Sequence, residues 1–362
     1  MRHERKCPCG AVERVINMKK TELCVLFGGR SSEYEVSLSS ACNILSAIDN
    51  EKYNVHKIGI DKEGRWYLYN GDDASIKNDT WKNGDITPVS VSLCKEGFFT
   101  SDGKLPCDVV LPALHGEFCE DGRLQGLLDT CGMKYVGCGM TASDSSMNKY
   151  LTKLVAENWG VPVAKYLHIR QRRFTRHKAE VFEDVKNKFT YPVFVKPVSA
   201  GSSVGASKVN NEGELEAALA EAIKYGGEAL IEEYITAKEI EVAVFGNEDP
   251  TASVCGEINP GAEFYDYETK YKNDTASYYI PARISDKCAE SVREYALRIF
   301  RALGCRGLSR VDFFVDKDEN IVFNEINTLP GFTNISMYPS LMKYSGMTDS
   351  EIIDGLIKFA LE

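Results

Sequence analysis

Three oxygen-bearing side chains, those of Asp312, Glu325 and Asn327, are spaced so that one β-hairpin would bring them together. Apolar runs flank the polar segment 316–320, a pattern that is typical of two strands joined by a turn. A turn centred in that segment puts Asp312 opposite Glu325. Asn327 shares the face of Glu325 because alternate residues of a strand point the same way. The sequence therefore predicts a cluster of oxygen ligands at one end of a hairpin.

This cluster needs a positive partner, because like charges directly opposed across a hairpin are destabilising. Hard oxygen donors suit Mg²⁺ or Mn²⁺, and Mg²⁺ sites are usually completed by water and substrate phosphates. The same register pairs Phe314 with Phe323 behind the cluster. A solvated acidic hairpin end is the alternative, but we favour a metal–phosphate site.

A glycine- and serine-rich segment, 200–205, follows a strand-like run that contains Lys196. Glycines let backbone N–H groups turn toward an anion, while Ser202 and Ser203 add donors and Lys196 adds positive charge. The segment matches neither the P-loop nor the dinucleotide-binding glycine pattern, so a structural loop is an equal alternative. Combined with the carboxylate hairpin, it predicts a nucleotide site.

Charged groups elsewhere would suit an amino acid. Glu33 follows a double-glycine turn near a helix start, where a carboxylate would repel pyrophosphate but would suit an ammonium group; a helix-capping role is the alternative. His115 follows a strand at the edge where open α/β sheets bind ligands, although a structural imidazole fits equally well. Arg310, on the strand face of Asp312, and the unobstructed N–H of Gly331 would suit an oxyanion.

The elements that must position these residues follow α/β and α+β patterns. Residues 18–140 read as an open, Rossmann-like α/β domain, followed by two further units over 141–232 and 233–362 with ligands in the clefts between them. Strands are expected at 23–27, 55–60, 109–114, 165–169, 193–196, 229–233 and 240–245, and helices at 36–48, 124–130, 149–159, 212–224 and 286–303.

Composition limits the classes of partner. Lys plus Arg total 43 against 53 Asp plus Glu, a net charge of −10, which argues against nucleic acid or an anionic membrane as the main partner. No apolar run is long enough to span a bilayer. The twelve cysteines include no CxxC pair, which favours free thiols in the cytoplasm over disulfides or zinc. Residues 1–17 are expected to be a flexible extension.

In this order the motifs resemble those of the D-alanine–D-alanine ligases of the ATP-grasp superfamily, from about residue 20 to the C-terminus. The resemblance implies a three-domain ATP-grasp architecture and a homodimer. It rests on the segments 28–33 with 36–37, 115–116 with 120–122, 196–197 with 201–205, 265–271, 310–312 and 324–331.

The resemblance also implies roles for individual residues. ATP would be bound at its phosphates by Lys149 and Lys196, near Ser203 and Asn324, at adenine by Glu232, Glu233, Tyr234 and Ile235, and at ribose by Glu239. Mg²⁺ would be held by Asp312, Glu325 and Asn327. Glu33 would bind the ammonium of the first D-alanine, linked through Ser202 to Tyr271, while Lys270 and Tyr271 lie on a closing loop. Arg310 and Gly331 would stabilise an oxyanion with His115 in the same catalytic group, and Ser336 would hold the second carboxylate.

The implied reaction joins two D-alanines through an acyl phosphate, for peptidoglycan precursor synthesis. Relatives that use D-serine often carry phenylalanine and arginine where this chain has Tyr265 and Met337, so D-alanine is favoured and a D-alanine–D-serine ligase is the alternative. An ATP sensor without ligase activity and an amide ligase with another acceptor are more distant rivals. Cys119, Ile335 and Asn148 depart from the glycine, histidine and aspartate usual in the family.

Overall fold

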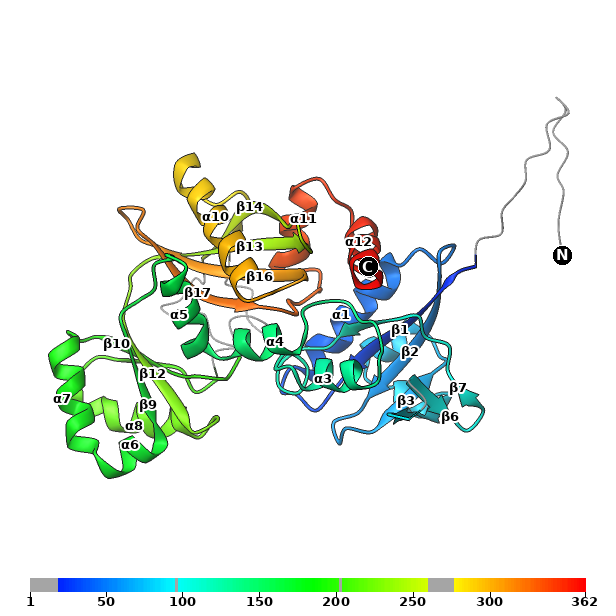
Figure 1. Cartoon of the computed structure of the whole chain (residues 1–362), viewed down its shortest axis with the longest axis horizontal. Coiled ribbons are helices and arrows are strands. Elements are labelled where there is room, and N and C mark those ends of the chain that lie inside the picture. The colour runs from blue at the N-terminus through cyan, green and yellow to red at the C-terminus, as the bar shows by residue number, and fades with distance from the viewer. Residues whose placement is uncertain (1–18, 95–96, 202–203, 260–276) are drawn as a thin grey trace, which may run out of the picture.

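The computed structural model describes residues 19–94, 97–201, 204–259 and 277–362 (Figure 1). The expected extension 1–17, the loop serines Ser202 and Ser203, and the three residues Tyr265, Lys270 and Tyr271 all lie outside these ranges. Within them, no helix is both long and apolar enough to cross a membrane.

The first third of the chain builds a mixed five-stranded sheet with the order β4-β3-β2-β1-β8. The apolar run of β1 forms its centre, paired in parallel with β2 and β8, and its residues 23–27 are fully buried, as expected for a strand covered on both faces. The elements are β1 (Thr21–Gly28), α1 (Tyr34–Ala47), β2 (Tyr53–Ile60), β3 (Trp66–Tyr69), α2 (Asp73–Lys77), η1 (Trp81–Asn83), β4 (Ile86–Pro88), β8 (Val109–Ala113) and α3 (Arg123–Thr130), with a small sheet of β5 (Ser90–Ser92), β6 (Gly97–Thr100) and β7 (Gly103–Lys104).

The middle of the chain forms an antiparallel four-stranded sheet with the order β11-β10-β12-β9. Its apolar face is covered by α8 and α7, whose buried side chains share one core with it. The elements are α4 (Met140–Met147), α5 (Lys149–Asn158), β9 (Tyr166–Arg170), α6 (Gln171–Arg176), α7 (Lys178–Lys188), β10 (Val193–Pro197), β11 (Ser207–Val209), α8 (Glu212–Ile223) and β12 (Glu228–Glu233).

The last third forms an antiparallel sheet with the order β15-β14-β13-β16-β17, which lies between the other two sheets along the long axis of the molecule (Figure 1). Helix α10 covers one face of this sheet, where an apolar core forms. The elements are β13 (Lys238–Gly246), β14 (Thr251–Asn259), β15 (Ser277–Tyr279), α10 (Asp286–Ala302), β16 (Gly307–Val315), β17 (Ile321–Asn327), α11 (Met337–Tyr344) and α12 (Asp349–Leu361).

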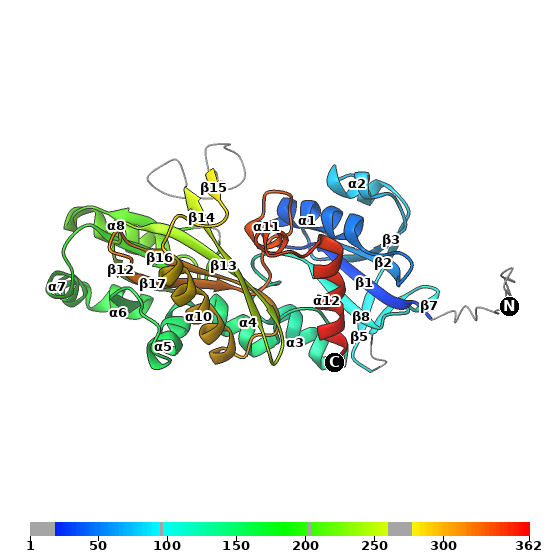
Figure 2. The same ribbon diagram turned by 90° about the horizontal axis from the view of Figure 1, so that it is seen from above.

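The C-terminal helix returns to the start of the chain. Helix α12 contacts α1 and β8, and its apolar face shares a core with both (Figure 2). The helix begins with a capping box in which Thr348 and Glu351 bond each other's backbone N–H groups. The last helix of the chain therefore completes the core of the N-terminal domain. The domain boundaries drawn from the sequence stay predictions.

The predicted hairpin is correct in one part and wrong in another. Asp312 does lie opposite Glu325, but Phe323 faces Phe313 rather than Phe314, because a β-bulge shifts the register between Asp312 and Phe313. The extra residue is Asn324. Phe313 and Phe323 meet edge to face in the core, with ring centroids 5.9 Å apart.

Candidate active site

Two adjoining pockets meet at the β16–β17 hairpin. The larger, a cavity of about 500 Å³, lies between the second and third sheets; the smaller, of about 110 Å³, lies between the third sheet and the N-terminal domain. Lys149, Glu241 and Glu325 line both pockets, so a ligand group in one lies beside a ligand group in the other. Ligand sites commonly occupy such clefts between domains.

The larger pocket contains a buried charge cluster. The Lys196 ammonium lies 3.1 Å from Oε1 of Glu232 and donates a 3.2 Å hydrogen bond to Oδ1 of Asn324. The same Glu232 oxygen lies 3.0 Å from the ammonium of Lys153, an ion pair outside hydrogen-bond geometry. Two cations thus share one carboxylate, so this cluster of three side chains carries an excess of positive charge.

Burial and pairing act on these groups in opposite directions. Burial raises the pKa of Glu232, but Lys153 and Lys196 outweigh that effect and lower it, so the carboxylate stays ionised. Burial lowers the pKa of Lys153, and the nearby Lys196 adds to this against the pull of Glu232. Lys153, which is fully buried on α5, was not predicted from the sequence.

The other predicted nucleotide residues, apart from Ser203 outside the described ranges, line the same cavity. Glu233 accepts a 2.8 Å hydrogen bond from the Lys165 backbone N–H, and the Lys208 ammonium stands 4.4 Å from the ring centroid of Tyr234. The pocket is lined by Lys149, Lys196, Asn324, and the adenine and ribose candidates Glu232, Glu233, Tyr234, Ile235 and Glu239.

Positive partners do lie beside the opposed carboxylates of the hairpin. Arg310 donates from Nε and Nη2 to the two oxygens of Asp312, at 2.8 and 2.7 Å, and its Nε lies 3.1 Å from Oε2 of Glu241. Burial alone would lower the pKa of Arg310, but Asp312 and Glu241 raise it well above its usual value. Glu241 lies on β13 directly across from Asp312, a neighbour that a single-hairpin reading could not reveal.

Glu325 has a cation of its own. The Lys149 ammonium lies 3.3 Å from Oε2 of Glu325 and donates a 2.7 Å hydrogen bond to the Ala200 carbonyl. Lys149 is placed by the start of α5, where Asn148 accepts hydrogen bonds from the next turn and caps the helix as an aspartate would. This lysine therefore ties the hairpin to the glycine-rich segment.

The hairpin donors fit a hard cation. Two carboxylates and the Asn327 amide are oxygen ligands, and a carboxylate oxygen bound to a cationic side chain still has a lone pair for a metal. Asn327 Oδ1 also accepts a 2.9 Å bond from the Leu329 N–H, which fixes its orientation. No group of three or more His, Cys, Asp or Glu side chains in the described ranges forms an alternative metal cluster.

The smaller pocket brings Glu33 to the hairpin from the opposite side. Glu33 is the N-cap residue of α1, yet its side chain does not cap the helix, so the capping alternative is wrong. Gly116 has a positive φ of 73°, and a Cβ there would lie 2.3 Å from Oγ of Ser31 and 3.6 Å from the Glu33 carboxyl carbon. Glycine is therefore required beside Glu33.

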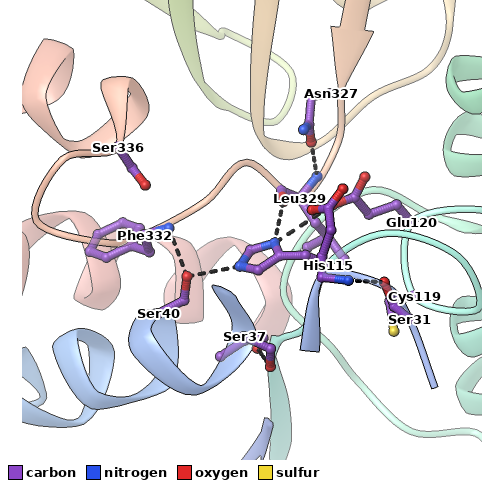
Figure 3. A network of polar contacts seen from close by, with 12 residues as sticks. Ser31, Ser37, Ser40, His115, Cys119, Glu120, Asn327, Leu329, Phe332 and Ser336 are labelled. Atoms are coloured by element: carbon purple, nitrogen blue, oxygen red, sulfur yellow. Dashed lines mark hydrogen bonds and ion pairs between the residues drawn. The ribbon is translucent and has the colours of Figure 1, made fainter. Parts of the chain in front are cut away.

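His115 is buried in a hydrogen-bond network (Figure 3). Its Nδ1 lies 3.0 Å from the Leu329 carbonyl and 3.6 Å from Glu120, and its Nε2 lies 2.8 Å from Oγ of Ser40. Burial lowers the pKa of His115, but Glu120, Glu33 and the Leu329 carbonyl raise it overall. Both ring nitrogens contact protein groups, so the His115 ring links α1 to the loop after β17.

Backbone and hydroxyl groups face the pocket from the loop after β17. Ser336 Oγ accepts a 2.9 Å hydrogen bond from the Thr333 N–H and lies 2.7 Å from the Thr333 hydroxyl. A Cβ at Gly331 would lie 2.9 Å from that Ser336 oxygen, so glycine keeps the two groups close. Met337 is buried beside the pocket, whereas Ile335 is 57% exposed.

A domain with a mixed sheet followed by two antiparallel sheets, with lysines and carboxylates between them, defines the ATP-grasp class. Family models agree: residues 22–138 match "D-ala D-ala ligase N-terminus" and residues 155–358 match "D-ala D-ala ligase C-terminus". The chain therefore belongs to the D-alanine–D-alanine ligase family.

Curated relatives and solved structures cover nearly the whole chain. D-alanine–D-alanine ligase B of Clostridium tetani is 44% identical over 96% of this chain and 95% of its own, and the Chlorobium limicola enzyme is 46% identical over 95% and 98%. The VanG D-Ala:D-Ser ligase of Enterococcus faecalis has a TM-score of 0.88 at 37% identity, covering 94% of this chain and 100% of its own. The D-alanine–D-alanine ligase of Coxiella burnetii gives 0.82 at 35%, over 94% and 95%. The expected fold class is confirmed.

Proposed function

We propose that this protein uses ATP to join two D-alanines into D-alanyl-D-alanine. The observation that carries the proposal is the junction of the two pockets at Lys149, Glu241 and Glu325. One pocket offers cations suited to phosphates, and the other offers Glu33, suited to an ammonium. An amino acid whose ammonium group is bound at Glu33 would therefore turn its carboxylate toward the end of a nucleotide's phosphate chain.

On the nucleotide side, Lys149 and Lys196 are the phosphate ligands. In the structure their ammonium groups rest on protein oxygens of Glu325, Glu232 and Asn324, so phosphates would replace these partners or share the lysines with them. Glu232 to Ile235 would meet adenine and Glu239 the ribose. Ser203 would add a donor to the phosphates.

Asp312, Glu325 and Asn327 would hold Mg²⁺, or Mn²⁺ in its place. When bound, the ion neutralises charge on the phosphates. Arg310 stays fixed to Asp312 and Glu241 and presents its cation to the same region.

The reaction then has two displacements. The carboxylate of the first D-alanine attacks the γ-phosphorus of ATP and releases ADP, giving an acyl phosphate. The amine of the second D-alanine attacks the acyl carbon, the C–O bond to phosphate breaks, and phosphate leaves. Arg310 and the Gly331 N–H would stabilise the oxyanion of this second step, and the protein contributes mainly position and charge.

Ser336 would hold the carboxylate of the second D-alanine. Ser202, Lys270, Tyr271 and Tyr265, which lie outside the described residues, are proposed to link Glu33 to the closing loop and to complete the second subsite. The second subsite is lined by the apolar Met337 and Ile335, and this supports D-alanine over D-serine because neither side chain can pair with an added hydroxyl. The product would serve peptidoglycan synthesis in the cytoplasm, and by resemblance the enzyme would be a homodimer.

Product analysis tests the proposal. The wild-type protein with ATP, Mg²⁺ and equimolar D-alanine and D-serine should release phosphate only when D-alanine is present and should form mainly D-alanyl-D-alanine by mass spectrometry. The E33Q variant should raise the KM for D-alanine by at least about tenfold with little effect on ATP. E35Q, at an exposed glutamate on the same helix, is the matched control. A mainly mixed dipeptide would refute the substrate assignment, and phosphate release without D-alanine would favour an ATP sensor.

A further inference from the structure

Helix α1 carries a polar stripe, Ser37, Ser40 and Asn43, at every third position, so the three side chains share one face. Ser37 and Ser40 are completely buried. Serine and asparagine are poor choices for a helix interior because their side chains compete for backbone hydrogen bonds. The burial of the two serines indicates that each has a specific partner outside the helix, and the partly buried Asn43 has one as well.

Ser37 fixes the two strand ends that lead into the smaller pocket. Its Oγ accepts a 2.7 Å hydrogen bond from the Gly28 N–H, at the turn before Glu33, and donates to the Ala113 carbonyl, two residues before His115. Ser37 therefore holds the backbone just before Glu33 and just before His115, the two N-terminal segments that line the smaller pocket.

Ser40 and Asn43 reach a different part of the chain, the loop after β17. The Phe332 N–H donates a 3.1 Å hydrogen bond to Oγ of Ser40, and Nδ2 of Asn43 donates a 3.0 Å hydrogen bond to the Phe332 carbonyl. Both polar backbone groups of Phe332 are thus bound by one helix. Figure 3 shows Ser40 on α1 between the His115 ring and Phe332.

The residue before Phe332 is Gly331, the proposed oxyanion donor. On its other side, the Leu329 carbonyl accepts from Nδ1 of His115 at 3.0 Å. The Gly331 N–H therefore lies between two backbone anchors, one at the Leu329 carbonyl and one at Phe332. An oxyanion donor is effective only when it is held within about 0.5 Å of its working position.

We propose that Ser40 and Asn43 are positioning residues of the ligase reaction, which set the Gly331 N–H of the C-terminal region from a helix of the N-terminal domain. This inference rests on the proposed function. Ser40 has a second task, because its hydroxyl both accepts from the Phe332 N–H and lies 2.8 Å from Nε2 of His115. The other ring nitrogen, Nδ1, donates to the Leu329 carbonyl, so Ser40 also helps to orient the ring that holds this backbone anchor.

A merely structural helix contact would act differently. The apolar residues of α1, such as Leu38 and Ala41, already hold the helix in the shared core. If the polar contacts to Phe332 were only structural, losing them would lower stability without changing the course of the reaction. Loss of positioning should slow attack on the acyl carbon. Water would then attack that carbon instead, the C–O bond to phosphate would break, and D-alanine and phosphate would leave without dipeptide.

The test compares S40A, N43A and S40T with S46A, an exposed serine on α1 that serves as the matched control. Phosphate and dipeptide are measured together in the wild type and each variant. S40A should lower kcat by roughly 10- to 100-fold, and N43A by roughly 3- to 10-fold, because each misplaces a donor rather than removing it. In both, phosphate released per dipeptide should rise from about one to about two or more, while the KM for ATP stays within about twofold. S40T, which keeps the hydroxyl, should restore the ratio.

The outcomes separate the two proposals. If the wild-type protein forms no D-alanyl-D-alanine, the proposed function is wrong, whatever the variants do. If the wild type is active and S40A and N43A keep the kcat and phosphate ratio of S46A, the positioning role is wrong, even if their melting temperatures fall. Should S40A fail to fold, N43A decides, because it leaves the bond between Ser40 and His115 in place.

Discussion

At the scale of single residues, Lys153 and Lys196 share the carboxylate of Glu232, so removing each of the three groups should have a different effect on stability. Removing one partner of a buried pair leaves an uncompensated charge, which destabilises a protein by roughly 3 to 5 kcal/mol. Removing one of two lysines leaves a complete pair and relieves a repulsion. Nothing in the sequence around Lys153 distinguishes it from the solvated lysines of a surface helix, and only the structure shows it to be fully buried.

We predict that E232Q destabilises the protein by about 3 kcal/mol or more, and that K153M destabilises it by less than about 2 kcal/mol. Urea unfolding at pH 7 measures both values. E233Q, at the half-exposed glutamate next in sequence, is the control and should change stability by less than about 1 kcal/mol. If K153M were the more damaging change, the shared-carboxylate account would be wrong.

Arg310 is a second residue whose chemistry can be isolated. Its planar fork holds both oxygens of Asp312 and also reaches Glu241, a geometry that a lysine ammonium cannot reproduce. R310K should therefore lower kcat by roughly 100- to 1000-fold with little change in the KM for ATP, as expected for a lost oxyanion contact. Steady-state kinetics measures this, with R306K, at the loop before β16, as the control. A kcat within tenfold of the wild type would remove Arg310 from the oxyanion site.

At the scale of elements, the bulge in β17 explains how neighbouring residues face one site. Without a bulge, Asn324 and Glu325 would point to opposite faces of the strand. The extra residue lets Asn324 bind Lys196 while Glu325 pairs with Lys149, and both side chains line the larger pocket. The pairing of Asp312 with Glu325 could be predicted from the sequence, because the turn of the hairpin is polar and its two strands are apolar. The bulge could not, because Phe313 and Phe314 are equally apolar and either could pair with Phe323.

Deleting Asn324 should leave the fold intact, because the pairs on either side, Asp312 with Glu325 and Phe313 with Phe323, then become neighbours in one regular ladder. The deletion should keep the circular dichroism spectrum but raise the KM for ATP by roughly tenfold or more through loss of the Lys196 partner. N324A, which keeps the bulge, should have a smaller effect. An unfolded deletion variant, or one with an unchanged KM, would contradict this reading.

At the scale of the whole molecule, helix α12 joins the two ends of the chain. The apolar positions of residues 349–361 and the capping box before them are visible in the sequence, but periodicity says only which helix face is buried, not what covers it. The covering surface comes from α1 and β8, more than two hundred residues earlier. The same distance explains why the contact between Ser40 and Phe332 could not be predicted from either segment.

Asp354 on α12 supplies the polar part of that junction and makes it sensitive to pH. The Tyr53 hydroxyl donates to Oδ1 at 2.8 Å, and Lys52 pairs with Oδ2. Burial raises the pKa of Asp354, but Lys52 and Tyr53 lower it below its ordinary value near 3.8. A carboxyl group with a depressed pKa in the folded state stabilises that state above its unfolded pKa, and the stabilisation is lost as the pH falls through the folded pKa.

D354N should therefore reduce the free energy of unfolding by about 1 to 2 kcal/mol at pH 7, a modest value because Lys52 is half exposed. The difference between wild type and D354N should shrink as the pH falls below about 4, because protonated Asp354 and the amide then have the same charge. Denaturant unfolding of both proteins from pH 7 to pH 3 measures it, with E51Q, at an exposed glutamate beside Lys52, as the control for general charge effects. A difference that does not decrease at all between pH 7 and pH 3 would mean that Asp354 contributes through shape rather than charge, and that α12 docks by its apolar face alone.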